Sequence, residues 1–95
     1  MAINLTSFDA AEHLTDPADQ ADLLAEADAS GDPHIVARAI GVVARARGMS
    51  AVADSTGIAR QALYRSFGDE GNPTLDTLLK VLPVLGIQMR FEIAA

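Results

Sequence analysis

The chain of 95 residues has the length of one small domain, with 49% hydrophobic and 21% charged residues, a composition typical of a globular protein. No apolar run approaches the roughly 20 residues of a membrane-spanning helix, and the first residues lack the pattern of a secretory signal, so we expect a cytoplasmic protein. The absence of cysteine excludes disulfides, thiolate metal sites and cysteine nucleophiles. A core of this size contributes about 3–5 kcal/mol, so we expect a partner subunit or protein to add stability.

The net charge of −6 is distributed unevenly along the chain. Residues 1–32 carry eight acidic residues and no Lys or Arg, which gives −8. Residues 33–67 carry five arginines against one acid, which gives +4, and residues 68–95 carry four acids against one Lys and one Arg, which gives −2. An acidic segment followed by a basic one predicts two partners of opposite charge; the alternative is a solvated acidic helix face that binds nothing.

The acidic segment is predicted to be helical. A brief turn is expected over AAEHL (10–14), and a longer helix begins at the Asp-Pro pair (16–17) and runs to about Ser30. Asp accepts hydrogen bonds from the first free N–H groups of a helix, and Pro fits the first helical position. Leu23 and Leu24 are the only large apolar side chains of this helix. We therefore expect it to be held weakly by the chain's own core and to become ordered on a partner.

A Gly-Asp-Pro sequence (31–33) ends this helix and starts the next one by the same signals. The second helix runs to about Arg47, where a glycine follows. Apolar residues at helical spacing predict that one face of this helix lies in the core. The residues of this stripe are Val36, Ala39, Ile40 and Val43.

Three further helices are predicted in the rest of the chain. Ser50 is expected to cap a short helix at 51–56, and another helix follows at about 59–67. After a glycine-rich loop, Thr74 is expected to cap a leucine-rich helix at 75–85. The fold class is therefore mainly α.

The end of the chain, IQMRFEI (87–93), alternates strictly between apolar and polar residues, which is the pattern of a half-buried strand. A single strand cannot satisfy its own backbone groups. We therefore expect it to pair with the same strand of a second copy across a two-fold axis. The alternatives are that the strand pairs with a partner's sheet, or that the dimer forms through the leucine-rich helix at 75–85. The predicted dimerisation residues are Ile87, Met89, Phe91 and Ile93.

Residues 49–67 have the pattern of a helix-turn-helix, in which two short helices flank a tight turn. Gly57 tolerates the positive φ of the turn, the small Ala53 lies where the helices approach, and Leu63 faces inward. In this arrangement the second helix lies in the DNA major groove with its first residues at the base edges. Further inward contacts are expected from Val52 and Ile58.

The outward side of the second short helix carries polar residues that can read bases. Arginine can donate two hydrogen bonds to guanine, and glutamine can pair with adenine. Serine hydroxyls and basic side chains on neighbouring elements can contact phosphates. The alternative is that this side is only a solvated helix face. The predicted DNA-binding residues are Arg60, Gln61, Tyr64 and Arg65 at base edges, and Ser50, Arg45, Arg47 and Lys80 at phosphates.

From about residue 16 to residue 91 the chain resembles the HigA-type addiction-module antidote proteins, which are small antitoxins with a Cro/C1-type (XRE-like) helix-turn-helix. The matching segments are GDP (31–33), VARARGMS (43–50), TG (56–57), LYRSF (63–67), GNP (71–73) and LLKVLPVLGI (78–87). The resemblance implies an antitoxin that neutralises a RelE/ParE-superfamily (HigB-like) toxin and represses its own operon by binding operator DNA as a homodimer. Relatives commonly carry a helix-capping Ser at the position of Ala59 and often a polar or basic residue at that of Pro83.

The division of charge agrees with this resemblance, because toxins of this class are usually basic and handle RNA. Residues 1–32 are therefore predicted to be a toxin-facing arm, and residues 33–95 a DNA-binding and dimerisation domain. The arm is expected either to cover the toxin's basic residues or to displace part of its fold. The predicted toxin-binding residues are Asp16, Asp19, Asp22, Leu23, Leu24 and Glu26.

Enzymatic chemistry is not indicated by the sequence. His13 and His34 lack the spacing of zinc ligands, and the carboxylates lie on polar surface segments. The Gly-Asp-Glu-Gly loop (68–71) lacks the lysine of a phosphate-binding loop. We therefore expect no catalytic residue, no metal and no cofactor. Two other functions stay open: a stand-alone transcriptional repressor without a toxin, and a protein-interaction module whose helix-turn-helix no longer binds DNA.

Overall fold

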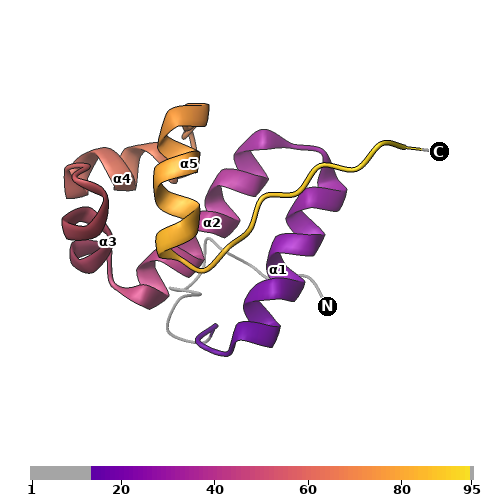
Figure 1. Cartoon of the computed structure of the whole chain (residues 1–95), viewed down its shortest axis with the longest axis horizontal. Helices are drawn as coiled ribbons and strands as arrows, with labels where there is room; N and C mark the ends of the chain where they lie inside the picture. Colours follow the sequence, from indigo (N-terminus) through magenta and orange to yellow (C-terminus); the bar gives the residue numbers. More distant parts are fainter. Residues whose placement is uncertain (1–13, 95) are drawn as a thin grey trace.

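Five α-helices form the regular structure of residues 14–94, the part of the chain that the computed structural model describes (Figure 1). Their bounds agree with the predicted ones to within two residues, so the mainly helical fold class is confirmed. The turn predicted at 10–14 lies outside the described residues except for Leu14. The helices are α1 (Pro17–Ser30), α2 (Pro33–Arg47), α3 (Met49–Thr56), α4 (Arg60–Ser66) and α5 (Leu75–Val84).

The predicted capping signals define where three of the helices begin. The Asp16 carboxylate accepts a hydrogen bond from the Ala18 N–H at 2.7 Å, and Pro17 is the first residue of α1. The Asp32 carboxylate accepts in the same way from the second residue of α2, at 2.9 Å. The Thr74 hydroxyl accepts from the Thr77 N–H at 3.1 Å. Gly31 ends α1 in the left-handed region, with φ of 67°, which glycine adopts without a steric penalty.

The predicted cap of α3 is wrong. The N-cap residue is Gly48, α3 already starts at Met49, and Ser50 lies exposed in the first turn. The Gly48 N–H also closes α2 by donating to the carbonyl groups of Ala44 and Arg45. One glycine therefore ends α2 and begins α3, and no residue is left between the helices for a serine cap.

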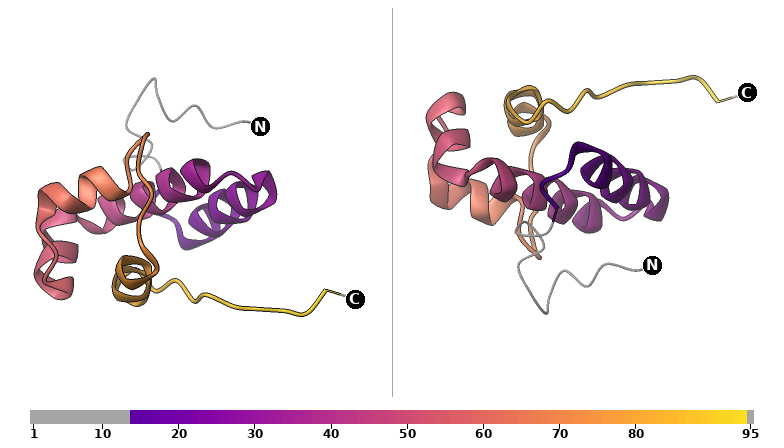
Figure 2. Two further views of the ribbon diagram at one scale, coloured as in Figure 1. Left: turned by 90° about the horizontal axis from the view of Figure 1, so that it is seen from above. Right: turned by 90° about the horizontal axis from the view of Figure 1, so that it is seen from below.

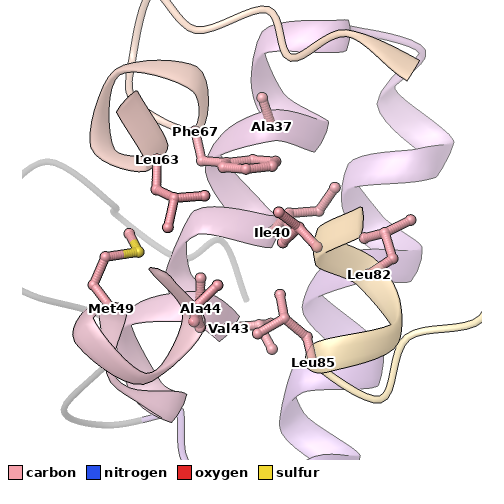
Figure 3. Close-up of a cluster of buried hydrophobic side chains, with 11 residues drawn as sticks. Ala37, Ile40, Val43, Ala44, Met49, Leu63, Phe67, Leu82 and Leu85 are labelled. Carbon is pink, nitrogen blue, oxygen red and sulfur yellow. The ribbon is translucent and has the colours of Figure 1, made fainter. Parts of the chain in front are cut away.

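α2 lies at the centre of the molecule, and α3, α4 and α5 enclose one end of it around the larger core (Figure 3). Ala39 and Ile40 of the predicted stripe are buried, as is Val43, and Val36 packs partly buried against this core. Burial of this apolar surface is the main source of stability in such a small chain. The larger core consists of Ala37, Ile40, Val43, Ala44, Met49, Val52, Leu63, Phe67, Val81, Leu82 and Leu85.

The loop that follows α4 runs along α2 in the opposite direction. A Cβ at Gly41 would lie 2.5 Å from the carbonyl oxygen of Phe67, so the two backbones are in direct contact. One turn earlier on α2, Arg38 forms an ion pair with Asp69 at 3.6 Å. At the start of α2, the His34 Nδ1 atom lies 2.9 Å from the carbonyl oxygen of Gly71 and donates to it in the matching tautomer.

α1 packs against α2 through a second, smaller core (Figures 1 and 2). Leu23 and Ala27 are 5% and 3% exposed and contact Ala39 and Val42 of α2. The expectation that this helix becomes ordered only on a partner is not confirmed for residues 17–30, which form a helix packed on α2 in the single chain. Two of the four buried residues in this contact are alanines, one on each helix, so the contact involves little large apolar surface.

The predicted strand is not confirmed. Among residues 14–94 no residue is in a strand, and residues 87–94 form an extended tail with no regular structure after α5 (Figure 1). Ile87 and Met89 pack partly buried against the larger core, whereas Phe91 and Ile93 are 88% and 99% exposed. A strand requires a hydrogen-bonding neighbour, and the described part of the single chain offers none. No described helix combines the length and apolarity needed to cross a membrane.

Candidate functional site

The turn between α3 and α4 has the predicted geometry. Gly57 has φ of 76°, in the left-handed region, and its N–H donates to the carbonyl oxygen of Ala53 at 2.9 Å. The Thr56 hydroxyl donates to the carbonyl oxygen of Val52 at 2.8 Å and accepts from the Ile58 N–H at 3.2 Å. Thr56 therefore fixes the direction in which the chain leaves α3. Sequence reasoning missed this role, although a Thr-Gly pair at a helix end is a typical turn signal.

The inward side of the α3–α4 pair is also as predicted. Val52 and Leu63 are 0% and 1% exposed, and Ala53 and Ile58 pack partly buried against the same core. The four outward residues of α4 are thereby fixed on the solvent side, because a seven-residue helix with one buried face leaves only the opposite face free. These exposed residues are Arg60, Gln61, Tyr64 and Arg65.

α4 carries positive charge and no acidic residue. The guanidinium carbon of Arg60 lies 5.5 Å from the centre of the Tyr64 ring, a cation–π contact across one turn. This contact joins two of the four predicted base-contacting side chains. Gln61 and Arg65 are exposed beside them.

The predicted phosphate-contacting residues are less uniform. Ser50 and Arg47 are exposed on either side of the α2–α3 junction, and Arg45 is half-buried. Lys80 lies on α5, where its amino group forms an ion pair with Asp76 at 3.1 Å. This carboxylate offsets part of the charge of Lys80, whereas Arg47 forms no such ion pair among the described residues.

The six predicted toxin-binding residues are divided by the packing of α1. Asp19, Asp22 and Glu26 are exposed, at spacings of three and four residues, so they lie on one side of the helix. Asp16 is exposed but is engaged as the cap. Leu23 is buried and Leu24 packs partly buried against both cores, so the leucines hold α1 to the molecule and Leu23 is not part of its surface.

Sequence reasoning missed a hollow of about 330 Å³ where the α1–α2 turn meets the loop before α5. Its apolar lining includes Val36, Ile40 and Leu78, and Asp28 and Asp32 also line it. The hollow is assembled from three separate segments of the chain, so no local pattern could predict it. The hollow provides accessible apolar surface next to the acidic helix α1. Leu23 provides none, because it is buried.

The basic and acidic surfaces lie on different sides of the molecule. In Figures 1 and 2, α3 and α4 lie at one end of α2, and α1 lies beside the other end of α2. Between residues 14 and 94 no group of three His, Cys, Asp or Glu side chains is arranged to hold a metal ion.

Ala59, the N-cap of α4, makes no capping hydrogen bond through its side chain. Its backbone is extended, with φ of −59° and ψ of 139°, which a serine can adopt. We expect Ala59→Ser to raise the free energy of unfolding by about 1 kcal/mol, since its hydroxyl would accept from a free N–H of the first turn. Urea unfolding monitored by circular dichroism measures this change. Ala51→Ser, an exposed change inside α3, is the control and should give no gain; an equal gain at both positions would contradict the capping argument.

The described residues thus form a small helical protein in which the basic helix α4 and the acidic helix α1 lie at different ends of the central helix α2. A model of the family described as "Probable addiction module antidote protein" matches residues 4–93. An uncharacterized protein of Haemophilus influenzae is 37% identical over 92 residues, which cover 97% of this chain and 95% of the relative. No solved structure matches.

The chain therefore belongs to the family of probable addiction module antidote proteins. An antidote of an addiction module is the antitoxin of a toxin–antitoxin pair, so the family implies a toxin partner. Such antidotes are generally not enzymes.

Proposed function

We propose that this protein is a HigA-type antitoxin that neutralises a RelE/ParE-superfamily (HigB-like) toxin and represses its own operon by binding operator DNA as a homodimer. The main support for DNA binding is that four side chains able to contact bases are exposed on the same helix, α4. These residues are Arg60, Gln61, Tyr64 and Arg65. The family match supports the antitoxin part.

In this proposal α3 and α4 are a Cro/C1-type helix-turn-helix, and α4 lies in the major groove of the operator. Arg60 and Arg65 donate paired hydrogen bonds to guanines, and Gln61 pairs with an adenine. Contacts to phosphate groups hold the protein in place without selecting the sequence. The proposed phosphate-contacting residues are Ser50, Arg47 and, more weakly, Lys80.

The proposed toxin-binding surface is the exposed side of α1, with Asp19, Asp22 and Glu26. A toxin that acts on RNA needs basic residues to hold the phosphates, and three carboxylates on one helix side attract such a surface. Leu24 and the hollow beside Asp28 supply apolar surface next to these charges. The antitoxin then acts by covering the residues with which the toxin binds RNA.

The experiment that tests this proposal is co-expression with the adjacent reading frame, followed by co-purification and a growth-rescue assay. A stable complex that restores growth is expected. No complex and no rescue would contradict the toxin-binding part and would favour a stand-alone repressor.

With the purified toxin, Asp22→Lys/Glu26→Lys is expected to weaken the complex by at least tenfold, because two attractive charges become repulsive at the interface. The loss should diminish at high salt, which screens exposed charges. Isothermal titration calorimetry of the toxin measures the affinity. The matched control, Asp54→Lys/Glu70→Lys, changes two exposed acids outside α1 and the net charge by the same amount, so its affinity should stay within about twofold. Equal losses in both variants would show that net charge, not α1, governs binding.

A further inference from the structure

The tail after α5 is divided into a packed part and an exposed part, and side chains alternate along it. Ile87 and Met89 pack partly buried against the core, while Gln88 and Arg90 are exposed. Continued alternation places Phe91 and Ile93 on the side of Met89, yet both are almost fully exposed. In Figure 2 the tail runs clear of α1 and α2. The described residues thus leave two large apolar side chains of the tail uncovered, and these offer apolar surface to another molecule.

Among residues 14–94, the backbone of the tail beyond Ile87 has no backbone hydrogen-bond partner. Among the described residues, the backbone–backbone hydrogen bonds of this region end with the Ile87 N–H, which donates to the carbonyl oxygen of Leu82 at 2.9 Å. Beyond it, the N–H and C=O groups of the extended segment make no backbone hydrogen bond to the described residues, as on an unpaired edge strand.

A hollow of about 310 Å³ opens beside the packed part of the tail. It lies between α5, which contributes Leu79, Leu82 and Pro83, and the tail residues Ile87 and Met89. Leu79 is 58% exposed. The hollow is therefore an apolar site with room for a large side chain.

We infer that the tail pairs with the tail of a second copy as an antiparallel two-stranded ribbon whose two-fold axis passes beside Phe91. This inference rests on the homodimer of the proposed function and specifies its register. A register is centred on a residue when that residue lies directly opposite its own copy in the partner. Directly opposite residues of an antiparallel pair have their side chains on the same face of the ribbon. Only a register centred on a residue therefore places apolar residues opposite apolar ones and polar residues opposite polar ones.

Charge selects among these registers. A ribbon centred on Phe91 places Arg90 opposite the partner's Glu92, and Glu92 opposite the partner's Arg90, so two attractive pairs form on the polar face. A ribbon centred on Arg90 places Arg90 opposite the partner's Arg90, and like charges directly opposite are destabilising. A ribbon centred on Met89 leaves Glu92 opposite the partner's Gly86 and forms no ion pair.

The same register satisfies the apolar face. It places Phe91 against the partner's Phe91, and aromatic pairs are among the more favourable cross-strand contacts. It also places the partner's Ile93 opposite Met89, which lines the hollow beside α5. Each copy thus supplies an apolar side chain next to the other's hollow, and the two exposed residues of the tail are both covered.

Charge reversal tests the register. We expect Arg90→Glu and Glu92→Arg each to weaken dimerisation about tenfold, because each turns two attractive pairs into repulsive ones. The double variant Arg90→Glu/Glu92→Arg restores the pairs with exchanged signs and should dimerise like the wild type. Sedimentation equilibrium without DNA or toxin gives the dissociation constants, and retained toxin affinity shows that each variant is folded. Single variants that dimerise like the wild type would overturn the register.

Cysteine cross-linking gives an independent test, since the chain has no cysteine of its own. In the inferred register Phe91→Cys faces itself across the axis, within the Cα–Cα range of about 4.4–6.8 Å that a disulfide spans. Arg90→Cys faces its copy only diagonally, at about 7–8 Å, and should cross-link poorly. Cross-linking at position 90 and not at 91 would overturn the register while leaving the dimer intact. A monomeric wild type would overturn the register and the proposed dimer together.

Discussion

Replacing both Arg60 and Arg65 with alanine is expected to weaken operator binding by about 100- to 1,000-fold. Each paired hydrogen bond between arginine and guanine contributes about 1–3 kcal/mol of discrimination, and about 1.4 kcal/mol corresponds to a tenfold change. Both side chains are exposed on α4, so their removal should leave the fold intact. Fluorescence anisotropy with labelled DNA from upstream of the reading frame, at one fixed salt concentration, measures the loss.

Further variants distinguish the loss of positive charge from the loss of hydrogen bonds to bases as the cause of weaker operator binding. Arg65→Lys keeps the positive charge but loses the paired donors, so it should lower sequence preference more than affinity for random DNA. Toxin binding by Arg60→Ala/Arg65→Ala should equal that of the wild type, because α1 lies on the other side of α2. Unchanged operator affinity would mean that α4 does not read the bases, and the protein would then be an interaction module.

Gly41→Ala is expected to lower the free energy of unfolding by about 2–3 kcal/mol, although alanine normally stabilises a helix interior by about 1 kcal/mol relative to glycine. The added Cβ would lie 2.5 Å from the carbonyl oxygen of Phe67 and 3.2 Å from its Cβ. The end of α4 and the loop after it must then move away from α2, which disturbs the buried Phe67 ring. The melting temperature should fall by about 10–20 °C in a domain of this size.

Gly31→Ala is the matched comparison for Gly41→Ala. A Cβ at Gly31 meets no atom within 4 Å, so the only cost is the left-handed backbone, about 1 kcal/mol. Differential scanning calorimetry of both variants separates the two effects. A Gly41→Ala variant as stable as the wild type would show that α4 can shift without cost and that the contact with Phe67 does not hold the loop.

The helix boundaries could be predicted from the sequence because their signals are local. Each capping side chain accepts a hydrogen bond from an N–H two or three residues further along the chain, as Asp16, Asp32 and Thr74 do. A short stretch of sequence is therefore enough to predict the cap. The solvent-facing side of α4 was predictable for a similar reason, since Gly57 and Leu63 fix the turn and the buried side within seven residues.

Three predictions were wrong or not confirmed: the packing of α1, the cap of α3 and the strand at the end of the chain. Each depends on more of the structure than the few residues from which it was predicted. α1 looked weakly held because its contact with α2 depends on Ala27 and Ala39, and small residues contribute little to a hydrophobic pattern although they permit close packing. Ser50 looked like a cap because serine is a common N-cap residue, and Gly48 was predicted only as the end of α2, although it is also the N-cap of α3. The strand at the end of the chain was predicted from the alternation of apolar and polar residues at 87–93. A strand also needs a second strand to which it can form hydrogen bonds.

The direct joining of α2 to its neighbours has a consequence for complexes that contain both toxin and DNA. α1 packs along α2, and α3 follows α2 after Gly48 alone, so no flexible linker separates the acidic helix from α4. The fifteen residues of α2 span about 22 Å at 1.5 Å per residue. A toxin held by α1 would therefore stand at a set distance and angle from the double helix. Whether two toxins fit side by side on adjacent half-sites then depends on the length of α2. Lengthening α2 by four residues, slightly more than one turn, would move each toxin by about 6 Å and rotate it by about 40°.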